Sequence, residues 1–216
     1  MELESVIRGR RSIRKYKPEP VPPELIREIL DEARWSPSWA NTQAWNIYVA
    51  AGETLERLRN SSQAPTPREA PAGPDFLMPR EWPPHLAART KQLIDLRSAA
   101  APEGTPTPGA GAPAQFYGAP CLLFFAVERG LINDYLLFDT GLIVQSVCLA
   151  AHDKGLGTCI MAMAVREPEV LRQILPEAAN SKFVIAVALG YPDEESPVNL
   201  FERQRASLDE LAHWAE

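Results

Sequence analysis

Cysteine and histidine are scarce in this chain, and neither is spaced as a metal site requires. The three cysteines, Cys121, Cys148 and Cys159, form no CxxC pair, and the three histidines are scattered. Structural zinc sites need closely spaced thiolate or imidazole ligands, so we expect no metal site. An odd set of unpaired cysteines also indicates buried thiols in a reducing compartment rather than a disulfide framework.

Long apolar runs and hydrolase motifs are missing too. No apolar run reaches the roughly 18 residues that cross a bilayer, and residues 1–7 are charged, without an apolar signal region. The GxSxG sequence of a nucleophile elbow does not occur. In GLGTCI, Ile160 stands where the third glycine of a GxGxxG motif would be, which leaves only a weak nucleotide signal. We therefore expect a cytoplasmic protein without a membrane partner.

Positive charge is in deficit overall and yet concentrated at one place. The 22 Lys and Arg against 28 Asp and Glu give a net charge of -6, which argues against a nucleic-acid partner. Residues 8–17, RGRRSIRKYK, nevertheless hold six basic residues. Guanidinium groups bind phosphate oxygens in pairs, so this segment is a candidate phosphate site. A solvated basic surface, or a basic nucleic-acid or localisation tract, is the alternative.

Hydrophobic patterning predicts helices with interleaved strands in one domain of 216 residues. Few hairpin signals occur between the strands, which favours an α+β or α/β sandwich. The expected helices cover residues 3–9, 23–35, 54–59, 85–98, 134–154, 168–175 and 208–214. The expected strands lie near residues 46–51, 121–127, 156–161 and 183–189.

Proline marks a long insertion at about 61–118, because 12 of the 21 prolines lie between Pro65 and Pro120. A segment of this length with its own helix is either a lid over a pocket or a harmless linker. A C-terminal arm follows from about residue 197 and carries Arg203 and Arg205.

Two further features carry polar groups. Residues 36–45, SPSWANTQAW, form a loop of small hydrogen-bonding side chains, which either contributes to a site or only makes turns and caps. Asp139 is a carboxylate inside the long apolar helix predicted for residues 134–154, so it either pairs with another group or faces a polar pocket.

Four stretches, in this order and spacing, resemble the FMN-dependent nitroreductase family. They are RRSIRKY at 10–16, SPSWANTQAW at 36–45, GLGTCIM at 155–161 and VALGYP at 187–192, followed by a basic tail. Members with an insertion and with sequences like FYGAP and YLLFDTG look like nitroarene or nitrobenzoate reductases. The resemblance implies a three-layer sandwich, with a mostly antiparallel central sheet flanked by helices, and an intertwined homodimer.

The resemblance also implies a flavin site built from both chains. Its residues would be Arg10, Arg11, Ser12, Arg14, Pro37, Ser38, Trp39, Asn41, Asp139, Ile160, Met161, Ala162, Arg203 and Arg205. The first three and the two tail arginines would hold the phosphate, and residues 37–41 would come from the partner. Residues 160–162 would lie along the ring. Arg14 and Asp139 would modulate the flavin, and no side chain would act as a nucleophile or base.

The implied reaction is a ping-pong transfer of hydride from NAD(P)H, through flavin N5, to an electron-poor acceptor. A nitroaromatic is the first expectation for this small aromatic substrate. The apolar residues after GLGTC differ from the more usual proline, glycine or acidic residues of the family, which leaves the substrate open. The alternatives are a quinone or enone reductase, a dehalogenase, a flavin-consuming enzyme, or a flavin-binding protein without turnover.

Overall fold

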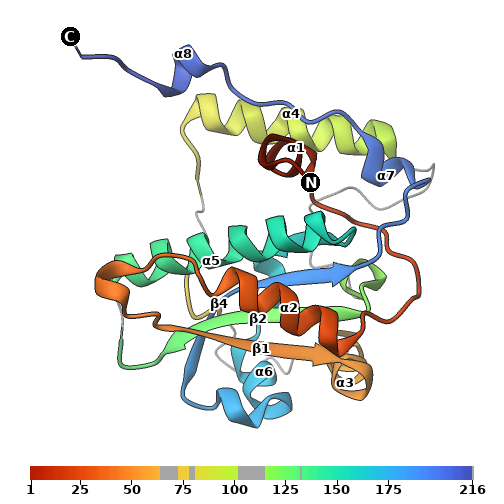
Figure 1. Cartoon of the computed structure of the whole chain (residues 1–216), viewed down its shortest axis with the longest axis vertical. Helices are drawn as coiled ribbons and strands as arrows, with labels where there is room; N and C mark the ends of the chain where they lie inside the picture. Colours follow the sequence, from red (N-terminus) through yellow and green to blue (C-terminus); the bar gives the residue numbers. More distant parts are fainter. Residues whose placement is uncertain (64–72, 78–80, 102–114, 132, 216) are drawn as a thin grey trace. The chain divides into compact units, whose positions relative to one another are not determined.

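The structure is a computed structural model that describes residues 1–63, 73–77, 81–101, 115–131 and 133–215 (Figure 1). The chain divides into two compact units. The first comprises Met1–Met78 and Gly111–Asp193, and the second comprises Pro79–Ala110 and Glu194–Glu216. The single domain expected for residues 1–216 stays a prediction. Much of the expected insertion at 61–118 lies outside the described residues.

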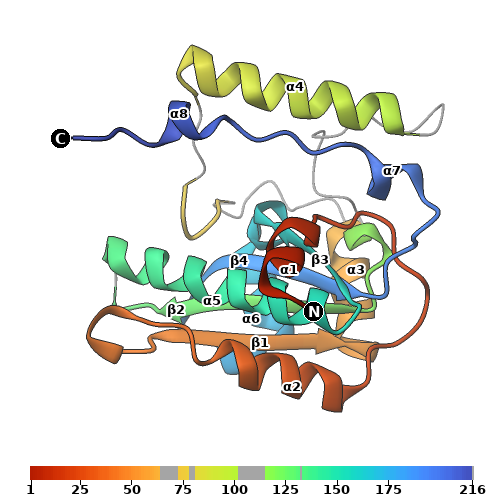
Figure 2. The same ribbon diagram turned by 45° about the horizontal axis from the view of Figure 1, so that its top comes forward.

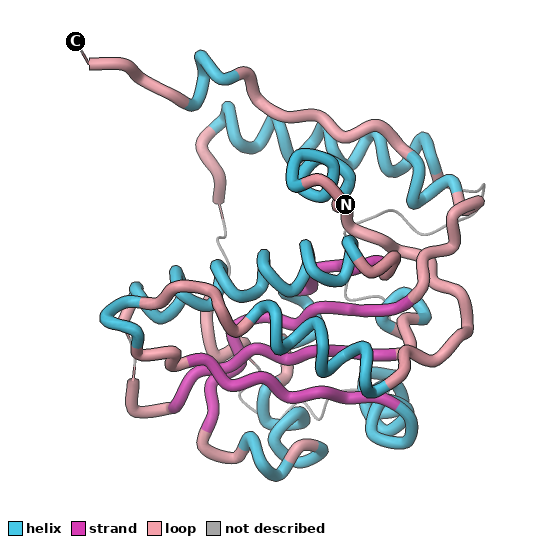
Figure 3. The backbone as a smooth tube through the Cα atoms, viewed as in Figure 1, coloured by secondary structure: helices cyan, strands magenta, loops and turns pink. Residues whose placement is uncertain are grey.

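A four-stranded antiparallel sheet organises the first unit (Figure 3). The strands run in the order β1-β2-β4-β3, with β1 at Trp45–Ala51, β2 at Cys121–Glu128, β3 at Gly157–Met161 and β4 at Ser181–Gly190. Each strand lies where the sequence predicts one, to within two residues at either end. β2 and β4 are the central strands, and this agrees with their continuous apolar sequences.

Helices cover both faces of the sheet, as Figure 1 shows. The pleat of β2 sends Leu122 and Phe124 to one face and Leu123 and Phe125 to the other. The first pair packs with α3 (Gly52–Gln63) and α6 (Pro168–Ile174), and the second with α2 (Pro23–Ala33) and α5 (Asp134–Asp153). These three layers confirm the predicted α+β sandwich.

The helix α5 is the longest element of the core. Asn133 caps its first turn by accepting a hydrogen bond from the Tyr135 amide at 2.7 Å. Within the described part of the chain, α5 alone is long and apolar enough to cross a membrane by length and composition. Here it packs on the sheet and on α2 and buries seven of its residues, so it serves as the central core helix.

The remaining helices include two that match the prediction, α1 and α4, and two that do not, α7 and α8. α1 (Leu3–Gly9) packs against α5 (Figure 2). A Cβ on Gly9 would lie 2.5 Å from His152 Nε2. In the second unit, α4 spans Pro84–Ala100, and α8 spans Leu208–Leu211, which is shorter than expected. A salt bridge from Arg89 to Glu210 joins these two helices at 2.7 Å. The short helix α7 (Pro197–Leu200) was not predicted.

A buried ion pair covers the half of β4 that β3 does not reach. β3 pairs with β4 only from Ala186 to Gly190. Beyond that point, Arg172 donates to the Ser181 carbonyl through Nε at 3.0 Å and Nη2 at 2.9 Å. Asp75 accepts from the Phe183 amide at 2.9 Å and from Arg172 Nη2. The pair therefore satisfies backbone groups that a neighbouring strand would otherwise bind.

Two buried cysteine thiols make the stability of this core fall at alkaline pH. Burial raises the pKa of the Cys121 thiol to about 12 and also raises the pKa of Cys148. In an unfolded chain thiols lose their protons near pH ~8.5. Above that pH the unfolded state binds fewer protons than the folded state, so the free energy of unfolding falls as pH rises.

We expect each of these thiols to cost about 1.4 kcal/mol per pH unit above ~8.5, up to its folded pKa. Urea unfolding at pH 8, 9.5 and 11 measures the slope. Cys121→Ala should remove the contribution of one thiol to the slope of the free energy of unfolding against pH. An unchanged slope in that variant would contradict the assignment.

Candidate active site

The basic segment lies against the end of β3. Ser12 forms a parallel bridge with Thr158, and the Ile13 amide donates to the Thr158 carbonyl at 2.8 Å. Further along, the Lys17 amide donates to the Tyr191 carbonyl at 2.9 Å. The segment therefore runs along the sheet edge and carries its arginines to the strand that the family resemblance predicts beside the flavin ring.

Gly157 makes this close approach possible. A Cβ at this position would lie 2.5 Å from Ile13 Cγ1 and 3.0 Å from Ile13 Cβ. Ile13 is buried and β-branched, so its Cβ cannot move without the backbone of the basic segment.

We expect Gly157→Ala to push the basic segment away from β3 and to weaken FMN binding by about tenfold or more, which corresponds to ~1.4 kcal/mol. Gly130→Ala is the matched control, because a Cβ there meets nothing within 4 Å. Fluorescence titration with FMN measures both affinities. Equal affinities would show that the close contact at Gly157 does not matter for the site.

Positive charge is concentrated in this segment. Burial and the like charge of Arg14 lower the pKa of Arg11, so the two guanidinium groups lie near enough to repel each other. Arg14 Nη1 donates to the Ser12 carbonyl at 3.2 Å. Arg10 is half-buried and contributes positive charge near Cys148. An anion would relieve the repulsion between the arginines, so these residues fit the phosphate of FMN.

The residues predicted to line the ring begin two positions after Thr158, at Ile160. Ile160 is 42% exposed, whereas Met161 is buried and Ala162 is half-buried. Ala162 begins the short 3-10 helix η3 (Ala162–Val165). The structure thus brings residues 10–14 and 160–162 to one edge of the sheet.

The second predicted group, residues 37–41, lies elsewhere in the chain. The 3-10 turn η1 (Trp39–Asn41) contains the left-handed residues Ala40 and Asn41, at φ 48° and 59°. Ser38 Oγ accepts from the Gln43 amide at 2.9 Å, so this hydroxyl helps to shape the loop. Pro37 and Asn41 are exposed.

Asp139 pairs with this loop. Its Oδ2 accepts from the Trp39 amide at 3.0 Å, and the Trp39 and Tyr135 rings stack with centroids 6.4 Å apart. Of the two alternatives that the sequence left open, pairing is therefore observed. A direct contact of Asp139 with flavin stays a prediction.

Strand register separates the predicted site residues 10–14 and 160–162 from those of the 37–41 loop. Thr158 is level with Leu189, Cys121 and Ala51, whereas the 37–41 loop precedes Trp45 at the opposite end of β1. Six residues of β1 separate the two levels, which corresponds to about 20 Å along the strand.

Arg203 and Arg205 belong to the second compact unit. Arg205 is exposed, and its Nη1 donates to the Gln204 carbonyl at 2.7 Å. Their part in binding the phosphate stays a prediction.

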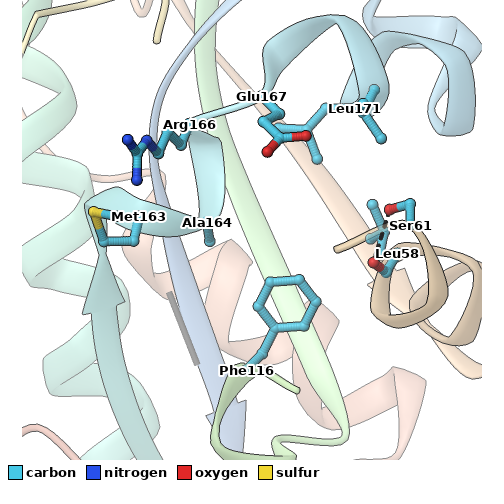
Figure 4. Close-up of a pocket in the computed structure, with 9 residues that line it drawn as sticks. Leu58, Ser61, Phe116, Met163, Ala164, Arg166, Glu167 and Leu171 are labelled. Atoms are coloured by element: carbon cyan, nitrogen blue, oxygen red, sulfur yellow. Dashed lines mark hydrogen bonds between the residues drawn. The ribbon is translucent and has the colours of Figure 1, made fainter. Parts of the chain in front are cut away.

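A pocket of about 190 Å³ opens beside η3 (Figure 4). In Figure 4 the ring of Phe116 and the carboxylate of Glu167 project into it from opposite walls. Phe116 and Tyr117 are left-handed, at φ 50° and 60°, in the turn η2 (Phe116–Gly118). The sequence did not predict this pocket. Its described lining residues are Leu58, Ser61, Phe116, Met163, Ala164, Arg166, Glu167, Val170 and Leu171.

Comparison with known proteins places this geometry in a family. Residues 7–191 match the Nitroreductase family, and the chain belongs to it. The chain is 28% identical to the 4-nitrobenzoate reductase of Pseudomonas putida, over 99% of this chain and 95% of that protein. It is 31% identical to the chloronitrobenzene nitroreductase of Comamonas testosteroni, over 97% and 95%.

A solved structure shows the same fold. The FMN and NADPH-dependent nitroreductase NfnB from Sphigopyxis sp. strain HMH superposes with a TM-score of 0.88 at 27% identity, covering 100% of both chains. Family membership and fold thereby confirm the predicted resemblance. The names of these relatives agree with the predicted cofactors and with a nitroaromatic acceptor.

Proposed function

We propose that this protein is an FMN-dependent oxidoreductase that moves hydride from NAD(P)H to an electron-poor acceptor, with nitroaromatic compounds as its first substrate class. The observation that carries the proposal is the arginine-rich segment that Ser12 and Ile13 fix to Thr158 of β3 in a Nitroreductase-family fold. FMN, when bound, supplies the hydride chemistry.

The residues at the edge of β3 bind different parts of FMN. Arg10, Arg11 and the Ser12 hydroxyl hold the phosphate by charge-assisted hydrogen bonds. Arg14 provides positive charge beside the ring and favours its reduced state. The exposed Ile160 side chain forms an apolar wall along the ring, and Met161 and Ala162 lie beside it.

A second copy of the chain completes the site in this proposal. The roughly 20 Å between the levels of Thr158 and Trp45, which follows the 37–41 loop in the chain, supports a homodimer, in which the loop of one copy serves the flavin of the other. Trp39, Tyr135 and Phe138 are all at least 59% exposed at that end of the unit, where a partner would cover them. We place the enzyme in the cytoplasm, where its thiols stay reduced.

Steady-state oxidation of NADH and NADPH with three acceptors tests the proposal. We expect the highest kcat/KM with 4-nitrobenzoate and parallel double-reciprocal lines, which indicate a ping-pong cycle. Turnover only with a quinone would indicate a quinone reductase. Turnover only with a halotyrosine would indicate a dehalogenase. A bound flavin that turns over with none of them would indicate a flavin-binding protein.

A further inference from the structure

Asp139 has a chemical environment that is unusual for a carboxylate. It lies within the apolar helix α5 and is only 3% exposed. Burying a charged group is costly unless a hydrogen bond stabilises it. The bond that Asp139 makes reaches 100 residues back in the sequence, to the Trp39 amide at 3.0 Å. A hydrophobic residue at position 139 would suit the core equally well, so this bond to the loop explains the carboxylate.

The loop that Asp139 reaches is held in an unfavourable backbone conformation. Ala40, Asn41 and Gln43 have φ values of 48°, 59° and 48°. Residues other than glycine seldom adopt this left-handed region, and of these three only asparagine tolerates it well. Such backbone persists only where surrounding contacts fix it, and it concentrates at functional sites.

Two side chains of α5 connect the loop to the core. Ser146 Oγ lies 2.7 Å from Ser36 Oγ at the beginning of the loop, and Asp139 binds the Trp39 amide in its middle. The hydrogen bond to the Asp139 carboxylate is the stronger of the two, because its acceptor is charged and both groups of the Ser36–Ser146 bond are neutral. The carboxylate also determines where Trp39 lies, and hence its stacking on Tyr135.

We propose that Asp139 is a positioning residue for the flavin site: its carboxylate fixes the Ser36–Gln43 loop in the shape that presents Ser38 and Asn41 to FMN. The inference rests on the proposed function. Without the carboxylate, the loop relaxes toward ordinary φ values and Asn41 leaves its place. The sheet and the arginines beside Thr158 keep their arrangement, because they lie at the other end of the unit.

Three variants test the proposal. Asp139→Ala removes the acceptor, and Asp139→Asn keeps a neutral oxygen that can accept from the Trp39 amide. Asp134→Asn is the matched control, because it changes an exposed carboxylate on the same helix. The two readouts are amide hydrogen exchange of peptides that cover residues 38–43 and the dissociation constant for FMN.

We expect Asp139→Ala to speed exchange in residues 38–43 and to raise the FMN dissociation constant, each by about tenfold or more. Asp139→Asn should recover part of both losses, and Asp134→Asn should change neither. Faster exchange with an unchanged dissociation constant would leave Asp139 a purely structural residue and overturn the proposal. Unchanged exchange in Asp139→Ala and Asp139→Asn would also overturn it.

A different outcome separates this inference from the proposed function. If the unaltered chain binds no FMN, the proposed function fails, whatever the variants do. If Asp139→Ala does not fold, Asp139→Asn decides the question, because its hydrogen bond is weaker at nearly constant volume. Equal exchange and equal FMN affinity in Asp139→Asn and the unaltered chain would then contradict a role for the carboxylate charge.

Discussion

Arg172→Ala should lower the free energy of unfolding of the first unit by about 3–5 kcal/mol, because it leaves the Asp75 carboxylate buried without its cation. The Arg172 and Asp75 side chains are only 6% and 10% exposed. The substitution also removes both donors from the Ser181 carbonyl. Urea unfolding, followed by circular dichroism, measures the loss, and Asp75→Ala should show a loss of similar size.

Arg129→Ala is the control for that experiment. Arg129 pairs with Glu169 at 3.2 Å, but both side chains are exposed, at 44% and 64%. Exposed ion pairs contribute at most ~1 kcal/mol. If Arg172→Ala and Arg129→Ala cost the same, the ion pair would not be what secures the open half of β4.

Arg11→Ala should weaken FMN binding by about 10- to 150-fold, which corresponds to ~1.5–3 kcal/mol for hydrogen bonds to a charged group. Arg11 is half-buried and adjoins Ser12, which is bridged to Thr158 at the edge of the sheet. Loss of this charge leaves the phosphate with fewer donors, while the bridge between Ser12 and Thr158 is retained. Titration of the apoprotein with FMN measures the effect.

Lys15→Ala is the matched control for Arg11→Ala. It removes a positive charge from the same segment, but Lys15 is exposed and its backbone carbonyl keeps the hydrogen bond from the Asp193 amide. We expect less than a threefold change, since an exposed charge is screened by salt. Equal effects of the two variants would mean that net charge, rather than a built site, attracts FMN.

The strands could be predicted because a strand that is buried on both faces has an unbroken run of apolar residues. Residues 121–127, CLLFFAV, are apolar on both faces, as a central strand requires. The helix α3 begins at Gly52, earlier than expected. The prediction missed its first two residues because Gly52 and Glu53 carry no apolar periodicity. α7 has only four residues, too few for any pattern to show.

Contacts between distant residues could not be predicted in the same way. The pair Asp75–Arg172 joins residues 97 apart in the sequence, and its position depends on where β3 ends. The left-handed turn at Ala40 gave no signal either, because alanine is not a turn former. The partner of Asp139 was one of two open alternatives, and only the packing of α5 beside the loop distinguishes them.

The family resemblance supplied what local patterns did not. RRSIRKY alone was equally consistent with a solvated surface, and its apposition to β3 is a property of the fold. Arg14, Ile160 and Asn41 became candidates for one site only through their order and spacing in the sequence. The structure brings the segments of Arg14 and Ile160 to one sheet edge, and a second copy that supplies the Asn41 loop stays a proposal.

Anaerobic reduction of the purified protein tests the central claim most directly. We predict that the protein with FMN shows an absorption band near ~450 nm, and that stoichiometric NADH or NADPH bleaches it. Subsequent addition of a nitroaromatic compound should restore the band. A protein that binds no FMN, or a bound flavin that neither nicotinamide bleaches, would contradict the account.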